Sequence, residues 1–290
     1  MKVLVFGAKG WIGQQFTDIL TQKEIEWVGA VSRADDEQAA ELEIAESGAT
    51  HVVSLIGRTH GKGFSTIDYL EQPGKLVENV RDNLFAPVSL ALICNQHGLH
   101  FTYLGTGCIF EYDEETGHPY GLEVNGFTEE SRPNFFGSSY SVVKGFTDRL
   151  MHNLNALNLR IRMPITETNH PRNFITKITN YAKICSVPNS MTVLPELLPM
   201  AVDMMCRGRV GTLNLTNPGL ITHNEILALY KEIVDPDFVW ENFSVEEQAQ
   251  ILAAGRSNNY LDTRLLESWH PEVRNIKEAV RHILQSWISK

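Results

Sequence analysis

Three glycines near the amino terminus constrain the fold more than any other feature of the chain. The segment GAKGWIG occupies positions 7–13, between a short apolar run, KVLVF, and a helical pattern, WIGQQFTDILTQ. Glycine suits a turn in which the backbone approaches a pyrophosphate closely while a helix N-terminus faces it. We therefore expect this turn to bind a dinucleotide cofactor through Gly7, Lys9, Gly10, Trp11, Ile12 and Gly13.

Apolar β-type runs alternate with helical patterns through the first half of the chain. The runs lie at 2–6, 26–32, 51–57, 100–110 and 159–165, and a long helical pattern at 77–98 contains Pro87, which is expected to kink it. This alternation is typical of right-handed βαβ units. It predicts an α/β fold, a Rossmann-type doubly wound parallel sheet with helices on both faces.

The residues after the second strand indicate which dinucleotide binds. Ser32 and Arg33 follow the glycines by about twenty positions. An acidic residue here would hold the ribose of NAD, whereas an arginine accommodates the 2′-phosphate of NADP. Ser32 and Arg33 therefore favour NADPH, but Asp35 and Asp36 are close enough to keep NADH as the alternative, and Arg33 could also be a solvated surface charge.

A change of pattern after residue 165 suggests a second domain. The regular alternation ends there, although the run at 211–217, GTLNLTN, is expected to rejoin the first sheet. We predict an NADP-binding Rossmann domain over residues 1–165 and a smaller, mainly substrate-binding domain over residues 166–290. The glycine-rich stretch at 58–75 and a polar insert that ends near 133 are expected to be loops.

The composition excludes several classes of partner and compartment. With 25 basic and 35 acidic residues the net charge is −10, which argues against nucleic acid or an anionic membrane as the main partner. The four cysteines are scattered and no tight Cys/His spacing occurs, so neither a metal site nor a disulfide framework is expected. No apolar run approaches the ~18 residues of a membrane span, and the first strand leaves no room for a signal peptide. We expect a cytoplasmic protein.

A Tyr-x-x-x-Lys pair supplies candidate catalytic groups. YSVVK places Tyr140 and Lys144 four residues apart, on one face of a predicted helix, and Thr106 lies upstream in a glycine turn at a strand end. A nearby ammonium lowers the pKa of a tyrosine, so Tyr140 could protonate an alkoxide while Thr106 donates a hydrogen bond to the same oxygen.

These motifs together resemble the extended short-chain dehydrogenase/reductase family. Longer blocks, among them GTGCIFEYD, PRNFITKI, VPNSMTVLPELLP and GRSNNYLD, resemble one group specifically. That group is the UDP-4-keto-6-deoxyglucose 3,5-epimerase/4-keto-reductases of UDP-L-rhamnose synthesis, known from plants and giant DNA viruses. The resemblance extends from the first strand to about residue 262.

The resemblance implies roles for individual residues. Thr106, Tyr140 and Lys144 match the reductase triad, and Cys108 and Lys177 match the pair assigned to epimerisation, with the base of that pair left open. Asn83 matches a helix asparagine that supports the active site. Backbone contacts to the cofactor are implied for Leu55 and Gly57, although SLIG at 54–57 departs from the plant pattern NAAG. Substrate contacts are implied for Asn173, Arg256 and Asn258.

The resemblance also implies partners and leaves alternatives. The chain lacks the 4,6-dehydratase half of many plant forms, so a separate dehydratase is expected to supply the UDP-sugar, and a homodimer is expected. One alternative is a dTDP-4-dehydrorhamnose reductase without epimerase activity, which the presence of both Cys108 and Lys177 argues against. A GDP-fucose-synthase-like enzyme fits fewer blocks. Another alternative is a non-catalytic NADP-binding regulatory subunit. Such a subunit would be free to lose Thr106, Tyr140 or Lys144, but all three are present. Cys94, Cys185 and Cys206 are assigned to the core.

Overall fold

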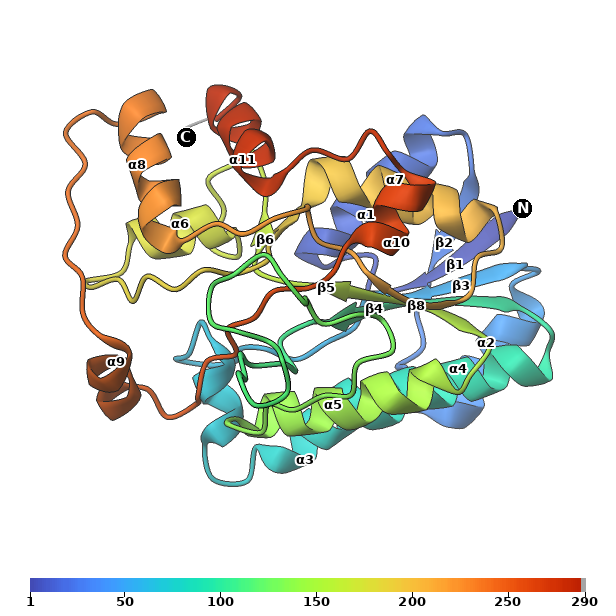
Figure 1. The fold of residues 1–290 in the computed structure, drawn as a ribbon. Coiled ribbons are helices and arrows are strands. Elements are labelled where there is room, and N and C mark those ends of the chain that lie inside the picture. The colour runs from blue at the N-terminus through green and yellow to red at the C-terminus, as the bar shows by residue number, and fades with distance from the viewer. Residues whose placement is uncertain (288–290) are drawn as a thin grey trace. The chain divides into compact units, whose positions relative to one another are not determined.

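Six of the strands form one sheet in the computed structural model, which describes residues 1–287 (Figure 1). The strand order is β2-β1-β3-β4-β5-β8, and the pairs β1/β2, β1/β3 and β3/β4 are parallel. The bounds are β1 (Lys2–Phe6), β2 (Glu26–Gly29), β3 (His51–Ser54), β4 (His100–Thr106), β5 (Ala156–Ile161) and β8 (Gly211–Asn214). The predicted Rossmann-type fold class is confirmed.

Helices cover both faces of this sheet because its strands are apolar on both sides. Alternate residues of β1 point to opposite faces, and Val3, Leu4, Val5 and Phe6 are all buried. One face is covered by α1 and the other by α2, α4 and α5 (Figure 1). The bounds are α1 (Trp11–Gln22), α2 (Glu37–Glu46), α3 (Leu76–Val80), α4 (Ala86–Gln96) and α5 (Ser139–His152).

The predicted helix at 77–98 has a wider turn in its middle. A π-helical turn, η2 (Arg81–Phe85), joins α3 to α4, directly before Pro87. Proline has no N–H and its ring crowds the carbonyl four residues earlier, which here belongs to Asn83. That carbonyl instead accepts a hydrogen bond from Thr147 Oγ1 at 2.6 Å. Pro87 therefore widens the helix locally, and the freed carbonyl is satisfied by α5.

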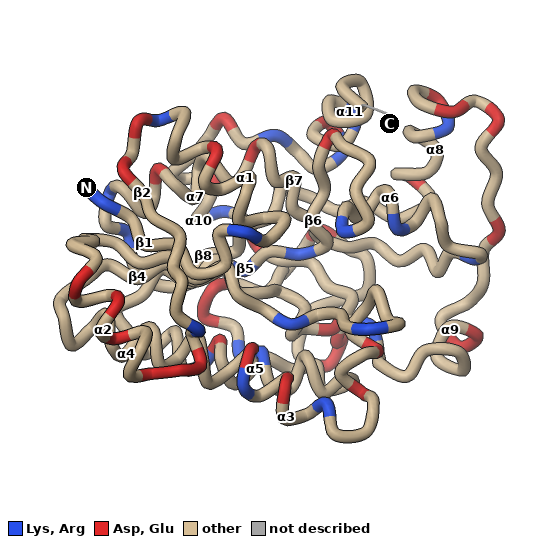
Figure 2. The backbone as a smooth tube through the Cα atoms, turned by 180° about the vertical axis from the view of Figure 1, so that it is seen from behind, with Lys and Arg blue, Asp and Glu red and all other residues tan. Residues whose placement is uncertain are grey.

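Two further sequence predictions need correction. The strand predicted at 26–32 ends at Gly29 and lies at the sheet edge with Trp27 and Val28 exposed. The next residues turn toward α2 because Glu43 accepts hydrogen bonds from the Val31 and Ser32 amides, each at 2.8 Å. Figure 2 marks the acidic residues of the chain in red. The loop predicted at 58–75 contains a 3₁₀ helix, η1 (Ile67–Glu71).

The chain divides into two compact units, each of which is described by itself. Unit 1 contains residues 1–109, 132–160 and 198–213, and unit 2 contains residues 110–131, 161–197 and 214–290. Residues 288–290, at the end of the predicted second domain, lie outside the described residues. The ligand assignments of the predicted domains, 1–165 for NADP and 166–290 for substrate, stay predictions. No helix among residues 1–287 is long and apolar enough to cross a membrane.

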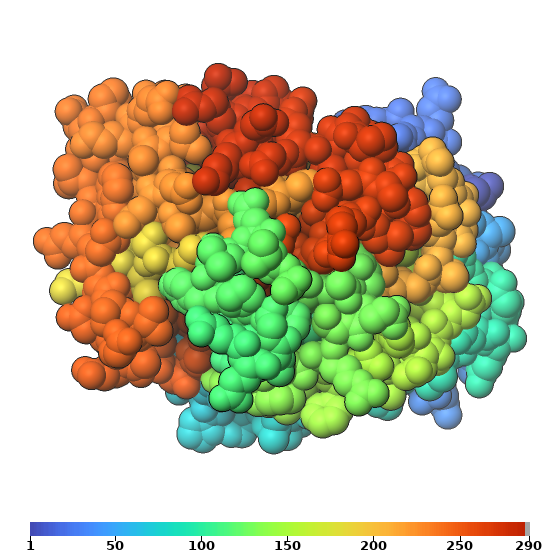
Figure 3. Space-filling model, in the orientation of Figure 1, coloured from blue at the N-terminus to red at the C-terminus, as the bar shows by residue number. Residues whose placement is uncertain are grey.

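Unit 2 packs short helices around a small two-stranded sheet. Its core includes Ile165, Val193, Ile226 and Val280. In the segment 110–131, Phe127 forms a parallel bridge with Leu261. Figure 3 shows this segment in green beside the red carboxy-terminal part of unit 2. The bounds are β6 (Pro164–Ile165), β7 (Thr192–Val193), α6 (Phe174–Thr179), α8 (His223–Ile233), α9 (Val245–Ile251), α10 (Arg264–Trp269) and α11 (Ile276–Gln285); α7 (Leu194–Cys206) continues into unit 1.

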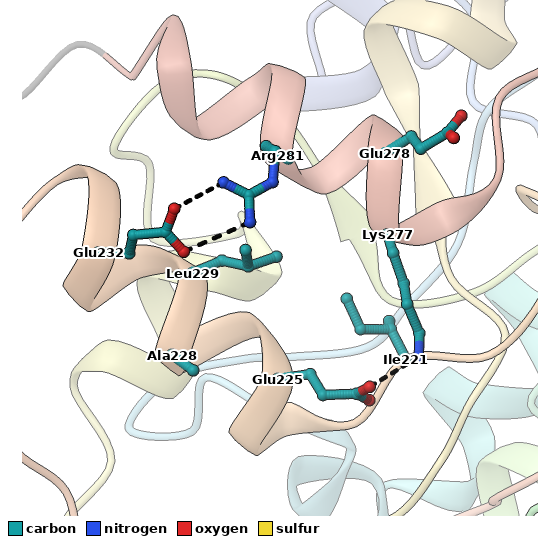
Figure 4. Close-up of a pocket in the computed structure, with 8 residues that line it drawn as sticks. All are labelled: Ile221, Glu225, Ala228, Leu229, Glu232, Lys277, Glu278 and Arg281. Atoms are coloured by element: carbon teal, nitrogen blue, oxygen red, sulfur yellow. Dashed lines mark hydrogen bonds and ion pairs between the residues drawn. The ribbon is translucent and has the colours of Figure 1, made fainter.

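A groove of about 350 Å³ lies between α8 and α11 on unit 2 (Figure 4). Two ion pairs cross it, Glu225 with Lys277 and Glu232 with Arg281, each at 2.7 Å. Its lining contains none of the residues that the sequence nominates for catalysis, cofactor or substrate. The groove is thus a feature of helix packing in unit 2, and the candidate site lies elsewhere in the chain.

A buried ion pair inside unit 1 gives a stability prediction. Arg160 on β5 and Asp148 on α5 pair at 2.7 Å with side chains 0% and 4% exposed. Asp148→Asn leaves the guanidinium buried without its counter-charge, so the free energy of unfolding should fall by about 3–5 kcal/mol. Urea denaturation measures this. Glu26→Gln, which breaks the exposed pair with Lys2, should cost less than about 1 kcal/mol. Equal losses would contradict the prediction.

Candidate active site

The glycine turn after β1 forms a backbone cradle at the start of α1. Gly7 has φ +88°, and the Gly10 amide donates to its carbonyl oxygen at 2.9 Å. A Cβ added at Gly13 would lie 2.0 Å from the same oxygen. Gly10 is the N-cap and the first turn of α1 has no acidic residue, so the positive end of the helix dipole suits a pyrophosphate. Lys9 is exposed and Trp11 and Ile12 are partly exposed beside it.

The ends of β1 and β3 meet beside this cradle. The position of an added Cβ at Gly7 lies 3.2 Å from the Leu55 carbonyl carbon. The connections leave β1 and β3 in opposite directions across the sheet, which is the place where open α/β sheets bind dinucleotides. Asn83 fixes the next residues, because its Oδ1 accepts from the Arg58 amide at 2.8 Å and its Nδ2 donates to the Arg58 carbonyl at 2.9 Å. A Cβ added at Gly57 would lie 3.5 Å from the same Asn83 Oδ1. The structure thus brings Gly7, Leu55, Gly57 and Asn83 together.

Arginines and aspartates form a charged network after β2. Arg33 pairs with Asp35 at 2.9 Å, and Arg81 also approaches Asp35, at 3.5 Å. Asp82 pairs with Arg81 at 2.7 Å and with Arg58 at 2.8 Å. The Arg33 side chain remains 67% exposed. Cationic groups that could meet a 2′-phosphate therefore lie at this corner of unit 1, each paired with a carboxylate.

The predicted reductase residues converge where β4 ends and α5 begins. The Thr106 side chain hydrogen-bonds with that of Tyr140, and the Cys108 amide donates to Thr106 Oγ1 at 3.1 Å. Ser141 Oγ, on the first turn of α5, donates to the Cys108 carbonyl at 2.7 Å. Cys108 also packs against the apolar cluster of Tyr69, Leu70 and Tyr140. Three predicted catalytic groups, Thr106, Cys108 and Tyr140, are thus adjacent within unit 1.

The electrostatics of Tyr140 and Lys144 differ from the prediction. Burial raises the pKa of Tyr140, the Cys108 charge adds to this, and the Thr106 hydrogen bond opposes it. Burial also lowers the pKa of Lys144 to about 7, against the charges of Asp148 and Cys108. Lys144 Nζ donates to the hydroxyl of Tyr103. The expected lowering of the Tyr140 pKa by Lys144 is therefore not seen, because burial dominates both groups.

Lys177 and Arg256 belong to a cationic cluster in unit 2. Burial lowers the pKa of Lys177, and the positive charges of Arg172 and Arg256 lower it further. Arg256 donates to the Ala254 carbonyl at 2.8 Å and is partly exposed. Guanidinium groups near an amine suit a diphosphate. Because Cys108 lies in unit 1, its pairing with Lys177 stays a prediction.

The two predicted substrate-contact asparagines are used inside unit 2. Asn173 is 0% exposed; its Oδ1 accepts from the Ile175 amide as the N-cap of α6, and its Nδ2 donates to the carbonyls of Thr166 and Thr168. Asn258 Oδ1 accepts from Asn189 Nδ2 at 2.9 Å. These bonds give both residues structural roles, and their contacts with substrate stay predictions.

Sequence reasoning missed several supporting residues. Glu71 accepts hydrogen bonds from the Ser139 amide and hydroxyl, at 2.7 and 2.9 Å, and so fixes the start of α5. Tyr69, from the same 3₁₀ helix, belongs to the same apolar cluster as Tyr140. Tyr103 holds Lys144. The stretch 58–75 shows no helical period, so only the acidic and aromatic residues within it could have signalled a packed segment. Within the described residues no group of His, Cys, Asp or Glu could hold a metal ion.

The Gly13 contact predicts how cofactor binding depends on this turn. In Gly13→Ala the new Cβ would clash with the Gly7 and Ala8 backbone, so α1 must move away from the cradle. NADPH binding measured by isothermal titration calorimetry should weaken at least about tenfold, equivalent to ~1.4 kcal/mol. Asp18→Ala, at an exposed position further along α1, is the control and should bind normally. Unchanged affinity in a folded Gly13→Ala protein would show that the turn does not hold the cofactor.

Comparison with known proteins agrees with this geometry. The L780 protein of Acanthamoeba polyphaga mimivirus is 56% identical over 286 residues, which cover 98% of both chains. Its crystal structure, that of a UDP-rhamnose synthase, matches with a TM-score of 0.95 over 99% of both chains. A bifunctional dTDP-4-dehydrorhamnose 3,5-epimerase/dTDP-4-dehydrorhamnose reductase of Arabidopsis thaliana is 42% identical over 279 residues, covering 96% of this chain and 90% of the plant protein.

A longer plant protein also matches. A trifunctional UDP-glucose 4,6-dehydratase/UDP-4-keto-6-deoxy-D-glucose 3,5-epimerase/UDP-4-keto-L-rhamnose-reductase of Arabidopsis thaliana is 42% identical over 282 residues, which cover 97% of this chain and 41% of that enzyme. These relatives confirm the resemblance inferred from the sequence blocks. The family profile matches residues 3–180. Together with relatives at 56% and 42% identity, this match shows that the chain belongs to the NAD dependent epimerase/dehydratase family.

Proposed function

We propose that this chain converts UDP-4-keto-6-deoxyglucose to UDP-L-rhamnose by epimerisation at C3 and C5 followed by NADPH-dependent reduction at C4. The observation that carries the proposal is the convergence of Thr106, Cys108 and Tyr140 where β4 meets α5. A reductase alone needs hydroxyl groups at the ketone, whereas an epimerase also needs an acid–base group beside it. The similarity to the mimivirus UDP-rhamnose synthase supports the same assignment.

Epimerisation uses the acidity of the carbons beside the C4 ketone. Loss of the proton from C3 or C5 gives an enolate whose charge lies on the C4 oxygen. The hydroxyls of Thr106 and Tyr140 are placed together and can both donate to that oxygen. The enolate is then reprotonated at the same carbon from the opposite face, so no proton is gained or lost overall and the configuration inverts.

Two groups on opposite faces of the sugar are needed for each inversion. We assign them to the Cys108 thiol and the Lys177 amine. Burial and the charges of Arg172 and Arg256 lower the pKa of Lys177, which makes its neutral form more available as a base than that of an ordinary lysine. A thiol side chain can donate a proton to carbon or, as the thiolate, accept one. Either group can act first in this scheme.

Reduction then uses the same oxygen. The glycine cradle and the corner around Arg33 would hold NADPH, which would supply a hydride for C4. The alkoxide that develops takes the proton of Tyr140, whose raised pKa keeps it protonated at neutral pH. Thr106 keeps its hydrogen bond to the oxygen throughout, and Lys144 is placed one helical turn from Tyr140 on α5.

The source of the substrate follows from its chemistry. A sugar nucleotide that carries a 4-ketone and a 6-deoxy carbon is the product of a 4,6-dehydratase. The trifunctional plant relative contains such an activity in the same polypeptide. We propose that a 4,6-dehydratase feeds this chain, and that both act in the reducing cytoplasm, where the free thiol of Cys108 would persist.

An apolar patch on unit 1 favours a homodimer. Exposed apolar side chains gather on α3, α4 and α5, helices that pack against one another. They are Val77, Val80, Leu92, Phe146 and Leu150, of which Val77 is 71% and Phe146 62% exposed. Exposed apolar side chains on neighbouring helices are typical of an interface between subunits. We propose that a second copy of the chain covers it.

Replacing Cys108 tests the epimerase part of the function. Wild-type protein with UDP-4-keto-6-deoxyglucose and NADPH should yield UDP-L-rhamnose, and in D₂O should incorporate deuterium at C3 and C5. Cys108→Ala should lose at least about 100-fold of the exchange rate, the usual contribution of an acid–base group, while still binding NADPH. NMR of the product measures its deuterium content and its configuration at C3 and C5, and isothermal titration calorimetry measures NADPH binding. Cys206, assigned to the core from the sequence, is exposed because it lies at the end of α7, so Cys206→Ala is the matched control. Wild-type exchange in Cys108→Ala, or a wild-type product with unchanged C3 and C5, would contradict the assignment.

Replacing Arg33 tests the cofactor preference. Arg33 is exposed and shares the Asp35 carboxylate with Arg81. Arg33→Ala removes one cation that can meet the 2′-phosphate, so the KM for NADPH should rise about tenfold, the cost of one charge-assisted hydrogen bond. The KM for NADH, which has no 2′-phosphate, should hardly change and serves as the internal control. Equal effects on both cofactors would contradict the role of Arg33.

A further inference from the structure

Tyr103 is a buried tyrosine that contacts the side chain of Lys144. It belongs to β4, three residues before Thr106, and is 1% exposed. Lys144 Nζ donates a hydrogen bond to its hydroxyl and lies 4.5 Å from the centroid of its ring. The residue has no part in the reaction described above, yet it is the hydrogen-bond acceptor that the structure gives Lys144.

The acidic groups on α5 and on two elements that pack against it, η2 and α3, are themselves paired. On α5, Asp148 pairs with Arg160 of β5 at 2.7 Å. On η2, Asp82 pairs with Arg81, and on α3, Glu78 pairs with Lys75. The titratable groups that act electrostatically on Lys144 or Tyr103 are Tyr140, Asp148 and Cys108. None of these carboxylates is shown bonding to Lys144 within residues 1–287, so the phenol remains the polar contact that fixes its Nζ.

A buried ammonium needs an acceptor to remain charged. Lys144 is 4% exposed, and burial lowers its pKa to about 7. A hydroxyl oxygen that accepts from the ammonium favours the charged form over the neutral amine. Burial raises the pKa of Tyr103 itself, with the charges of Tyr140 and Asp148 adding to the effect, so the phenol stays neutral and accepts through its lone pairs.

We propose that Tyr103 is a positioning residue for Lys144: its hydroxyl fixes Nζ below the active site and keeps the amine protonated in a dry interior. The proposal rests on the proposed function in one respect, that Lys144 serves the reduction as an ammonium. Tyr103 touches neither substrate nor cofactor in this scheme and acts only through Lys144. The buried phenol thus decides over which pH range the lysine carries its charge.

The expected pH dependence follows from the sign of this effect. Lys144 is charged below its pKa and neutral above it. Without the phenol oxygen the ammonium loses an acceptor, so the pKa of Lys144 falls further. The pH at which the reduction loses rate on the alkaline side should therefore move down in Tyr103→Phe. A hydrogen bond to a charged group corresponds to a shift of about one to two pH units.

A titration of Lys144 tests the proposal without any substrate. Protein labelled with ¹³C at lysine Cε is titrated by NMR, and the Lys144 signal is assigned by its absence in Lys144→Met. The Tyr103→Phe protein should show this signal titrating about one to two units lower than in wild type. Tyr103→Met removes the same hydroxyl with a flexible apolar side chain and replaces Tyr103→Phe if that variant does not fold. An unchanged Lys144 titration in a folded variant overturns the proposal.

Steady-state kinetics give a second, separable readout. At saturating UDP-4-keto sugar and NADPH, the alkaline limb of kcat in Tyr103→Phe should move to lower pH with little change in KM. A purely structural role would instead lower kcat by the same factor at every pH. Tyr230→Phe, which removes a phenol hydroxyl from α8 in unit 2, is the control and should show no shift. If wild type does not turn over this substrate, the proposed function fails, while the NMR titration still decides the role of Tyr103.

Discussion

The close contact between α1 and the turn after β1 is the constraint on which the candidate cofactor site depends. Only hydrogen can occupy the Cβ position of Gly13, because the carbonyl oxygen of Gly7 lies 2.0 Å from it. This contact sets the height of the helix N-terminus above the sheet. It also brings Gly7 against the Leu55 backbone, at the point where the connections of β1 and β3 diverge. Backbone packing therefore builds the cradle before any side chain contributes.

A continuous set of hydrogen bonds then joins the cofactor loop to the catalytic helix. The Asn83 side chain holds the Arg58 backbone, and its carbonyl, left without its usual helical partner by Pro87, accepts from Thr147 on α5. One turn before Thr147, the same helix carries Lys144 into the interior. A shift of η2 would therefore move both the loop and α5. The π-helical turn is a local irregularity that connects the two halves of the site, as such turns frequently do.

The sequence was sufficient for the features that depend on local pattern. Strand and helix periods predicted the sheet, and glycine spacing predicted the cradle, because both follow from backbone geometry. Contacts between residues that are far apart in the sequence could not be predicted from it. Nothing local to Tyr103 indicates that it will meet a lysine 41 positions later, and burial reversed the expected direction of the Tyr140 pKa. Asn173 lies in a matching block, yet it serves as the cap of α6. Similarity of a block therefore does not separate residues that contact ligand from residues that hold the fold.

The chain carries a net charge of −10, and at the cofactor corner too the arginines are accompanied by carboxylates. Arg33, Arg58 and Arg81 gather there, but Asp35 and Asp82 already occupy their guanidinium groups. A 2′-phosphate must therefore compete with the Asp35 carboxylate for Arg33 and Arg81. It can do so because a phosphate monoester carries about −1.5 to −2 charges near pH 7, against −1 for the carboxylate, and offers three acceptor oxygens. The strength of NADPH selection under the proposed function then depends on the difference between two anions, so Asp35 limits it as directly as Arg33 provides it.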